Sequence, residues 1–280
     1  AGGTTADPDA NVNDAWSLDL ETGAWSRLES VAPPPSPSRA AGVDERAALL
    51  LAADGQAYTL DVGTEVVAPL APLPAAAVRG AFVPAAPSSS PGSFVSFVSF
   101  CGVASASACA VSALDLDGGA PHWSTVSPTG FSPSGRAGVA YGFDDEGHRA
   151  VLFGGQSDDG AISAESWSLD TTHVSSGSVT FNHLATKGLD PPARVDACGV
   201  VDPLGRRFFV FGGRDADGVV LQPWVLDLDH EDARWRPVTL DGLPARSGCS
   251  AVYDTAHTRI LVGFGDDGES ERADVWAIDL

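Results

Sequence analysis

The sequence predicts an all-β fold of the β-propeller type, and three observations support this prediction. Apolar residues rarely recur at the i, i+3, i+4 spacing of an amphipathic helix. Instead, β-rich segments of about four to eight residues alternate with Gly, Pro, Asp and Asn. These segments recur as a unit of roughly 50 residues, which suits the four short strands of one propeller blade.

The most regular feature of the unit is a Leu-Asp or Ile-Asp dipeptide, which we assign to the third strand of each blade. Its copies begin at Leu18, Leu60, Leu114, Leu169, Leu226 and Ile278. An aromatic residue stands two positions earlier at Trp16, Tyr58, Trp167, Trp224 and Trp276, whereas Ser112 is the exception. The Trp side chains are large enough to wedge between units and bury apolar surface there.

The other strands of the unit are identified from their position relative to this dipeptide. An apolar run ending in Gly predicts the second strand, at 151–155, 208–213, 260–265 and, in degenerate form, 97–102. An Arg followed by small and apolar residues opens the first strand, at 136–139, 194–197 and 246–249. A second aromatic residue after the dipeptide predicts the fourth strand, at 25–28, 123–126, 181–184 and 235–238.

This unit resembles the kelch repeat. The copy at 246–254 reads Arg-x-Gly-x-Ser-Ala-Val-Tyr-Asp, and Gly-Gly, Trp-x-Leu-Asp and a following Trp stand in other copies. The resemblance covers essentially the whole chain, strongly over 131–280 and in degenerate form over 31–126. It implies a kelch-type β-propeller, the architecture that galactose oxidase shares. The Gly-His and Trp-Asp signature of WD40 propellers is missing, and residues 17–25 match the sialidase Asp-box only in part.

We expect residues 1–280 to form a single propeller domain of six four-stranded blades. Residues 1–30 supply a partial first blade, and 241–280 supply a last blade without its fourth strand. The blades between them are 31–72, 73–128, 129–187 and 188–240. A five-bladed ring closed by N-terminal strands, or a seven-bladed ring, is the alternative. Because the sequence has no Met, we also expect further chain before Ala1, and the unfinished last blade suggests more after Leu280.

The charge balance excludes several classes of partner. The chain carries 37 acidic residues against 16 basic ones, a formal net charge of −21, and Lys187 is the single lysine. Nucleic acid is not an expected partner, because phosphate binding requires a basic surface. No apolar run reaches the roughly 18 residues of a transmembrane helix, so we expect no transmembrane segment.

The four cysteines form two candidate disulfide pairs. Cys101 and Cys109 flank the turn between the second and third strands of one blade, where antiparallel partners reach disulfide geometry. Cys198 and Cys249 lie at the first strands of two consecutive blades, nearly in register. Buried free thiols are the alternative for all four. Disulfides would place the protein in an extracellular, periplasmic or organelle-lumenal compartment; a cytoplasmic location is the alternative.

No cofactor is expected, and calcium is the one metal with a candidate site. Asp7, Asp9, Asn11 and Asn13 alternate as the oxygen ligands of a calcium loop do, but Val12 and Leu18 stand where an EF-type loop places Gly and Glu. The six His residues are scattered, and no Cys-x-x-Cys spacing occurs. The copper and tyrosine chemistry of galactose oxidase has no counterpart in these residues.

The candidate binding residues are the arginines that open the first strands: Arg39, Arg79, Arg136, Arg194 and Arg246. In kelch proteins the loops before the first strand and after the second lie on one face and frequently form the ligand surface. By resemblance, an inner arginine ring on that face is rimmed by the acidic loops 156–163, 214–219 and 266–274. The ring either grips a carboxylate-bearing ligand, or each Arg braces its own blade.

The leading functional hypothesis is a non-catalytic scaffold that binds a protein partner through one loop face, as a subunit of a larger complex. The alternatives are a carbohydrate-active kelch enzyme, of the sugar-acid epimerase or oxidase type, and a carbohydrate-binding module. No catalytic residue is identified, because no Gly-x-Ser-x-Gly, phosphate loop or dinucleotide fingerprint occurs. Since one fold hosts many functions, the fold alone does not decide between these hypotheses.

Overall fold

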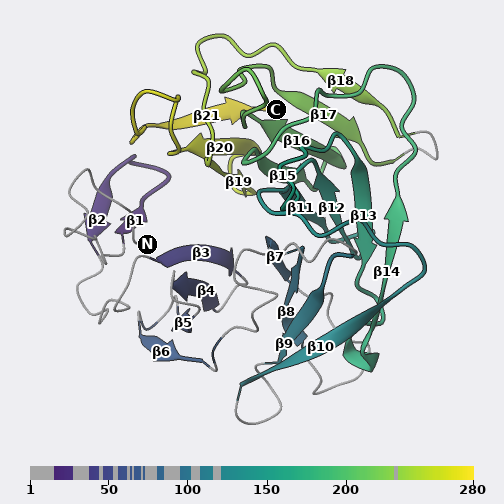
Figure 1. Cartoon of the computed structure of the whole chain (residues 1–280). Coiled ribbons are helices and arrows are strands. Elements are labelled where there is room, and N and C mark those ends of the chain that lie inside the picture. Colours follow the sequence, from purple (N-terminus) through teal and green to yellow (C-terminus); the bar gives the residue numbers. More distant parts are fainter. Residues whose placement is uncertain are drawn as a thin grey trace.

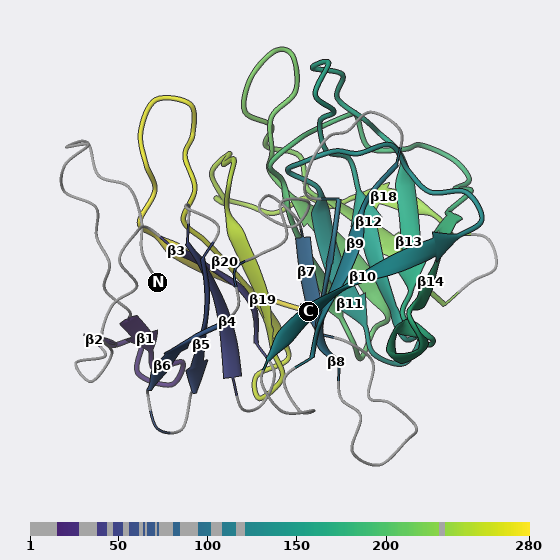
Figure 2. The same ribbon diagram turned by 60° about the horizontal axis from the view of Figure 1, so that its bottom comes forward.

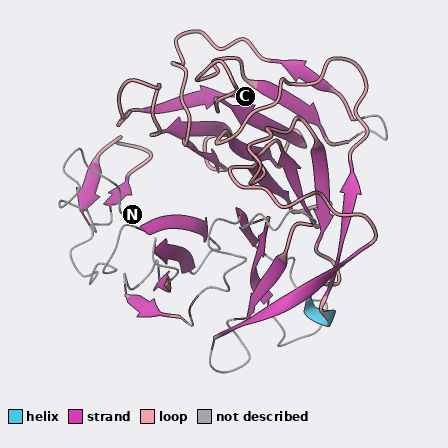
Figure 3. Ribbon diagram, viewed as in Figure 1, coloured by secondary structure: helices cyan, strands magenta, loops and turns pink. Residues whose placement is uncertain are grey.

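The strands of the chain stand in groups around a common centre, as a β-propeller requires (Figure 1). This arrangement is seen in a computed structural model. The structure describes residues 16–27, 38–43, 47–52, 56–61, 64, 66–70, 72, 81–84, 95–101, 108–115, 121–229 and 233–280. Figure 3 shows that strands and loops make up almost all of this part, with one short helical turn.

The strands follow one another in antiparallel order within each group. The first two groups are β1 (Trp16–Leu18) and β2 (Trp25–Arg27), then β3 (Ser38–Val43), β4 (Ala47–Ala52), β5 (Ala57–Asp61) and β6 (Val67–Pro69). The next are β7 (Ala81–Pro84), β8 (Val95–Phe100), β9 (Val111–Asp115) and β10 (His122–Thr129), then β11 (Ala140–Asp144), β12 (Arg149–Phe153), β13 (Ser166–Asp170) and β14 (Ser178–His183). The last are β15 (Cys198–Asp202), β16 (Arg207–Phe211), β17 (Trp224–Asp227) and β18 (Trp235–Pro237), then β19 (Ser250–Asp254), β20 (Arg259–Gly263) and β21 (Val275–Asp279). The 3₁₀ turn η2 (Val174–Ser176) precedes β14.

The core lies between neighbouring sheets as well as within them. Among the residues whose burial is described, the second strands β12, β16 and β20 are buried on both faces, because each sheet packs against the next one around the ring. In β12 the run from Ala150 to Phe153 is buried, and in β16 the run from Phe208 to Phe211 is buried. Trp235 then fills the space between the two sheets, with its ring 5.2 Å from that of Phe153 and 6.0 Å from that of Phe208. These continuous apolar runs explain why strict alternation is weak in the second strands.

Glycines set the closest approach between sheets. Gly154 and Gly212 follow second strands with φ of 75° and 58°, in the left-handed region. A Cβ atom at either position would overlap the carbonyl oxygen of the Arg that opens the next unit, Arg194 or Arg246. The following glycines donate to those carbonyls, Gly155 N to Arg194 O at 2.9 Å and Gly213 N to Arg246 O at 2.8 Å. Successive sheets are therefore joined backbone to backbone.

A buried carboxylate closes the turn between the first and second strands in three units. Asp144, Asp202 and Asp254 are 3%, 1% and 6% exposed. Each accepts from an Arg five residues later, at Nε distances of 3.0, 3.0 and 2.9 Å for Arg149, Arg207 and Arg259. Each also accepts from the backbone N–H three residues later. The signal for this turn in the sequence is the spacing Asp-x-x-x-x-Arg, which occurs in all three units.

Two of the sheets are joined through their outer strands, which the repeat did not predict. β10 pairs in parallel with β14, Ser127 to Thr129 against Ser178 to Thr180. β10 has eight residues, and its pairing with β9 ends at Val126, so its last residues are free to reach the neighbouring strand. The hydroxyl groups of Thr129 and Thr180 lie 2.8 Å apart at this junction.

The first and last strand groups also lie side by side (Figure 1). Arg259 Nη2 donates to Leu20 O at 2.9 Å, and the rings of Trp25 and Phe264 are 6.1 Å apart. Phe264 takes the place that Gly212 takes in the preceding unit. The hairpin β1–β2 therefore packs against the last sheet, while the number of blades in the ring stays a prediction. No helix in the described ranges has the length and apolar character needed to cross a membrane.

Candidate functional site

The connections between second and third strands form a set of loops at one end of the sheets. Figure 2 shows the loop between β20 and β21 projecting at this end, with its counterparts from the neighbouring units. Three of these loops are each tied down by two isolated bridges, in the order Ala137–Gln156–Ile162, Val195–Arg214–Val219 and Ser247–Asp266–Glu271. The bridges give the three loops the same backbone course. We call the residues 156–163, 214–222 and 266–274 the loop face.

The inner edge of the loop face is a chain of backbone hydrogen bonds that crosses three units. Asp196 N donates to Gly138 O at 2.8 Å, and Gly248 N donates to Asp196 O at 2.8 Å. These residues stand at the same position of successive units, two residues after the opening Arg. The equivalent residues Gly138 and Gly248 have no side chain, whereas the carboxylate of Asp196 forms an ion pair with Arg214 at 2.8 Å. The loop face therefore carries one charged pair near its inner edge.

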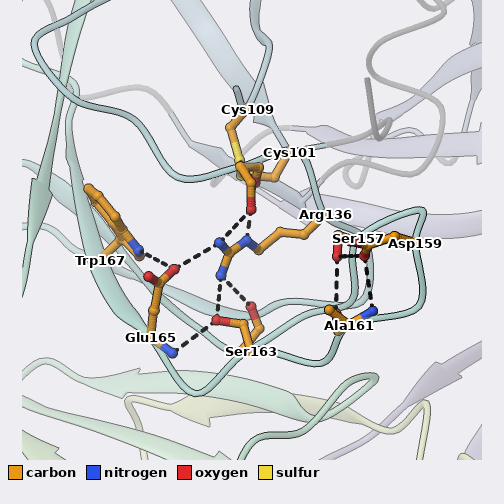
Figure 4. Close-up of polar contacts among 11 residues, drawn as sticks. Cys101, Cys109, Arg136, Ser157, Asp159, Ala161, Ser163, Glu165 and Trp167 are labelled. Atoms are coloured by element: carbon orange, nitrogen blue, oxygen red, sulfur yellow. Dashed lines mark hydrogen bonds and ion pairs between the residues drawn. A yellow bond between two sulfur atoms is a disulfide. The ribbon is translucent and has the colours of Figure 1, made fainter. Parts of the chain in front are cut away.

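The opening arginine Arg136 is buried and bonded within its own unit (Figure 4). Its Nη2 donates to Glu165 Oε2 at 2.8 Å, and its Nη1 donates to Ser163 Oγ at 2.7 Å. Trp167 Nε1 donates to the same Glu165 oxygen at 3.2 Å. Partial burial opposes ionisation of Glu165, but the bonds from Arg136 and Trp167 outweigh it and lower the pKa of this carboxyl.

Arg194 and Arg246 are buried in the same way, at 1% exposure each. Arg194 Nη1 donates to Gly212 O and Gln222 O, and Arg246 pairs with Asp274 at 3.1 Å. The contacts of Arg136 and Arg246 therefore have the geometry of the bracing alternative, whereas Arg194 leaves its Nη2 without a hydrogen-bond partner among the described residues. Arg39 stands on β3 with its side chain outside the described residues, and Arg79 lies outside them altogether.

The tips of the loop face are acidic. Asp158, Asp217, Glu269 and Glu271 are exposed, and their carboxylates accept no hydrogen bond among the described residues. The loops of adjacent units also lie close together, since a Cβ at Gly268 would be 3.3 Å from Val219 Cγ2. Leu221, 55% exposed, stands beside them. The loop face thus combines fixed backbone, exposed carboxylates and an apolar side chain.

Asp267 holds the loop 266–274 in shape, and this makes the loop sensitive to acid. Ser270 N and Glu269 N donate to its Oδ1 at 2.7 and 3.0 Å, and Arg272 forms an ion pair with Oδ2. These bonds lower the pKa of Asp267 to about 2. Because the folded pKa lies below the unfolded value, the stabilisation is complete above about pH 4 and is lost as the pH falls toward 2.

We therefore expect Asp267 to titrate with a midpoint near pH 2 in a carboxyl-detected NMR experiment, well below the value of about 3.9 for an unperturbed aspartate. Asp267→Asn should leave the unfolding transition nearly unchanged while increasing amide hydrogen exchange at Glu269 and Ser270. A midpoint close to the unperturbed value of about 3.9 would contradict the hydrogen-bonded geometry.

The four cysteines are joined as Cys101–Cys109 and Cys198–Cys249. The first disulfide closes the connection between β8 and β9, with Cα atoms 4.4 Å apart. The second joins the start of β15 to the residue before β19 across 51 residues of sequence, with Cα atoms 5.5 Å apart. The second bridge therefore links two neighbouring sheets next to the inner edge of the loop face.

The calcium candidates Asp7, Asp9 and Asn11 lie outside the described residues, as does Asn13. Within the described ranges, no group of three or more His, Cys, Asp or Glu side chains is arranged to hold a metal ion. Glu165 and Asp274, which accept hydrogen bonds from Arg136 and Arg246, were not among the predicted site residues. Their signal is an acidic residue two positions before the Trp of the third strand.

Comparison with known proteins gives two matches. A family model described as the KLHDC2/KLHL20/DRC7 Kelch-repeats domain matches residues 96–280. Adagio-like protein 3 of Oryza sativa subsp. japonica is 30% identical over 161 residues, which is 56% of this chain and 25% of that protein. The chain thus spans about a quarter of the length of that curated relative. Both matches agree with the repeat read from the sequence.

Proposed function

We propose that this chain, which belongs to the kelch-repeat family, is a rigid platform that binds a protein partner through the loop face. Kelch-repeat domains generally mediate protein–protein interaction. The observation that carries the proposal is the shape of the loops, since equivalent bridges fix all three of them before any partner arrives. A preorganised surface binds with a smaller loss of conformational entropy than mobile loops do.

The chemistry of the loop face favours a partner with a basic surface. Asp158, Asp217, Glu269 and Glu271 present carboxylates at the tips, and the whole chain has a formal net charge of −21. Such a field steers a basic partner and repels acidic ones. Leu221 and Val219 give the same surface apolar side chains for the contact itself.

The test compares two variants with the same change of charge at opposite ends of the sheets. Asp217→Asn/Glu269→Gln removes two carboxylates of the loop face, and Asp145→Asn/Asp279→Asn removes two at the other end. We expect the first variant to weaken binding of the captured partner by about fivefold, because each surface carboxylate that is removed costs about 0.5 kcal/mol of binding free energy. The control variant should bind as the unmodified chain does. Equal binding by both, or loss only in the control, would reject the loop face as the binding surface.

We propose further that the protein works in an extracellular, periplasmic or lumenal compartment. The support is the pair of disulfides, because such bonds persist in oxidising compartments and are rare in the cytosol. Counting free thiols in protein isolated from its natural source under alkylating conditions tests this. Four alkylated cysteines would place the protein in a reducing compartment instead.

A further inference from the structure

The three buried arginines are held alike in their own units, so their remaining donors point to equivalent places. Nε donates to the carbonyl two residues earlier, at Ser134, Pro192 and Pro244. Nη1 donates to the carbonyl 18 residues later, at Gly154, Gly212 and Phe264. With two atoms of a planar guanidinium fixed, the position of Nη2 is fixed as well.

In two units the place that Nη2 faces is occupied by a carboxylate oxygen. Glu165 Oε2 accepts from Arg136 Nη2 at 2.8 Å and from Trp167 Nε1 at 3.2 Å. Asp274 Oδ2 accepts from Arg246 Nη2 at 3.1 Å and from Trp276 Nε1 at 2.5 Å. One oxygen therefore satisfies a guanidinium donor and an indole donor together.

The unit between these two keeps both donors but has Gln222 in place of the acid. Gln222 stands 28 residues after Arg194, as Asp274 stands 28 residues after Arg246. Its amide is turned away, and Nε2 donates to Pro223 O at 3.0 Å and to Val238 O at 2.7 Å. Among the described residues, Arg194 Nη2 and Trp224 Nε1 are therefore buried without a hydrogen-bond partner.

Two unpaired donors at one place point to a missing acceptor. Arg194 is 1% exposed and Trp224 is 7% exposed, so neither donor is satisfied by bulk water. Leaving such groups unpaired is costly, and more so for a charged one. Burial lowers the pKa of Arg194 to about 10, which the charge of Asp215 only partly opposes.

We propose that Arg194 Nη2 and Trp224 Nε1 form a binding site for the carboxylate of a ligand, in the place that Glu165 and Asp274 fill in the two adjacent units. In those units the side chains of Glu165 and Asp274 are 46% and 38% exposed, so the place that their carboxylates fill lies at the border between the buried donors and solvent. A ligand carboxylate enters beside Gln222, and one of its oxygens accepts from both donors. The carboxylate belongs either to a small organic acid or to the end of a peptide chain. This inference does not depend on the proposed protein partner.

The test follows the indole N–H resonance of Trp224 in ¹⁵N-labelled protein, assigned by its loss in Trp224→Phe. Acetate is titrated at constant ionic strength, with chloride as the replaced anion. We expect a saturable shift of the Trp224 resonance with acetate. The Trp167 resonance should stay in place, because its N–H already donates to Glu165.

Two near-isosteric variants exchange the behaviour of the two sites. Gln222→Glu supplies the carboxylate from the chain, so its Trp224 resonance should start at the shifted position and ignore acetate. Glu165→Gln makes the opposite change, so Trp167 should acquire the acetate response. Thermal unfolding of each variant checks that both are folded before the titration is interpreted.

N-acetylglycine and N-acetylglycinamide separate the two sources of the carboxylate. A response to acetate supports a site for small organic acids, and a response to N-acetylglycine alone supports a peptide terminus. No saturable shift with either acid, or an equal shift with the amide, overturns the proposal. It is also overturned if Gln222→Ala alone displaces the Trp224 resonance, because the Gln222 amide then fills the site in solution.

Discussion

Replacing both Cys198 and Cys249 by Ser lowers the free energy of unfolding by about 4 kcal/mol, the largest effect that we expect from a covalent change. The disulfide closes a loop of 51 residues, and the entropy it removes from the unfolded chain grows with loop length. It also joins β15 to the start of β19, so its loss loosens the contact between two sheets. Denaturant unfolding followed by Trp fluorescence measures the change.

The matched control is the double Ser replacement of Cys101 and Cys109. This disulfide spans only eight residues, so the same argument predicts a loss of about 2.5 kcal/mol. The first variant should therefore unfold at the lower denaturant concentration. If the variant lacking Cys101 and Cys109 unfolded at the lower denaturant concentration instead, loop length would not determine how much each disulfide stabilises the protein.

Gly212→Ala destabilises the protein by about 2 to 5 kcal/mol, because it pushes two sheets apart. Its Cβ would overlap Arg246 O, a backbone atom that has no alternative position while Gly213 N donates to it. The overpacking costs about 1 to 3 kcal/mol, and the left-handed φ of 58° adds about 1 to 2 kcal/mol for a residue with a Cβ.

Gly160→Ala isolates the backbone part of this cost. Gly160 has a φ of 87°, and a Cβ there would meet nothing within 4 Å. We expect a loss of only about 1 to 2 kcal/mol in thermal or denaturant unfolding. If Gly160→Ala were as destabilising as Gly212→Ala, the close contact between sheets would not be the cause.

The repeat in the sequence predicts the strands well because each carries its own local signal. The Trp-x-Leu-Asp copy at 224–227 coincides with β17, and the copy at 167–170 lies within β13. The Gly-Gly pairs that end the predicted second strands also stand where the backbones of neighbouring sheets come closest, at Gly154 and Gly212. Such features depend on a few neighbouring residues, which the sequence displays directly.

Features that depend on several distant groups were harder to predict. The parallel pairing of β10 with β14 arises from the length of β10 and the position of the next sheet, neither of which has a motif. Gln222 stands where the adjacent units have an acidic residue, but a single exposed Gln is not a recognisable signal in the sequence. Only the structure shows that Arg194 Nη2 and Trp224 Nε1 are both buried without a hydrogen-bond partner among the described residues.

The central claim is that a partner binds the loop face, and hydrogen–deuterium exchange of the chain with and without its captured partner tests this directly. We expect protection of the amides in 156–163, 214–222 and 266–274, with unchanged exchange in the turns 144–149, 202–207 and 254–259 at the other end. Protection of those turns with an unchanged loop face would contradict the account.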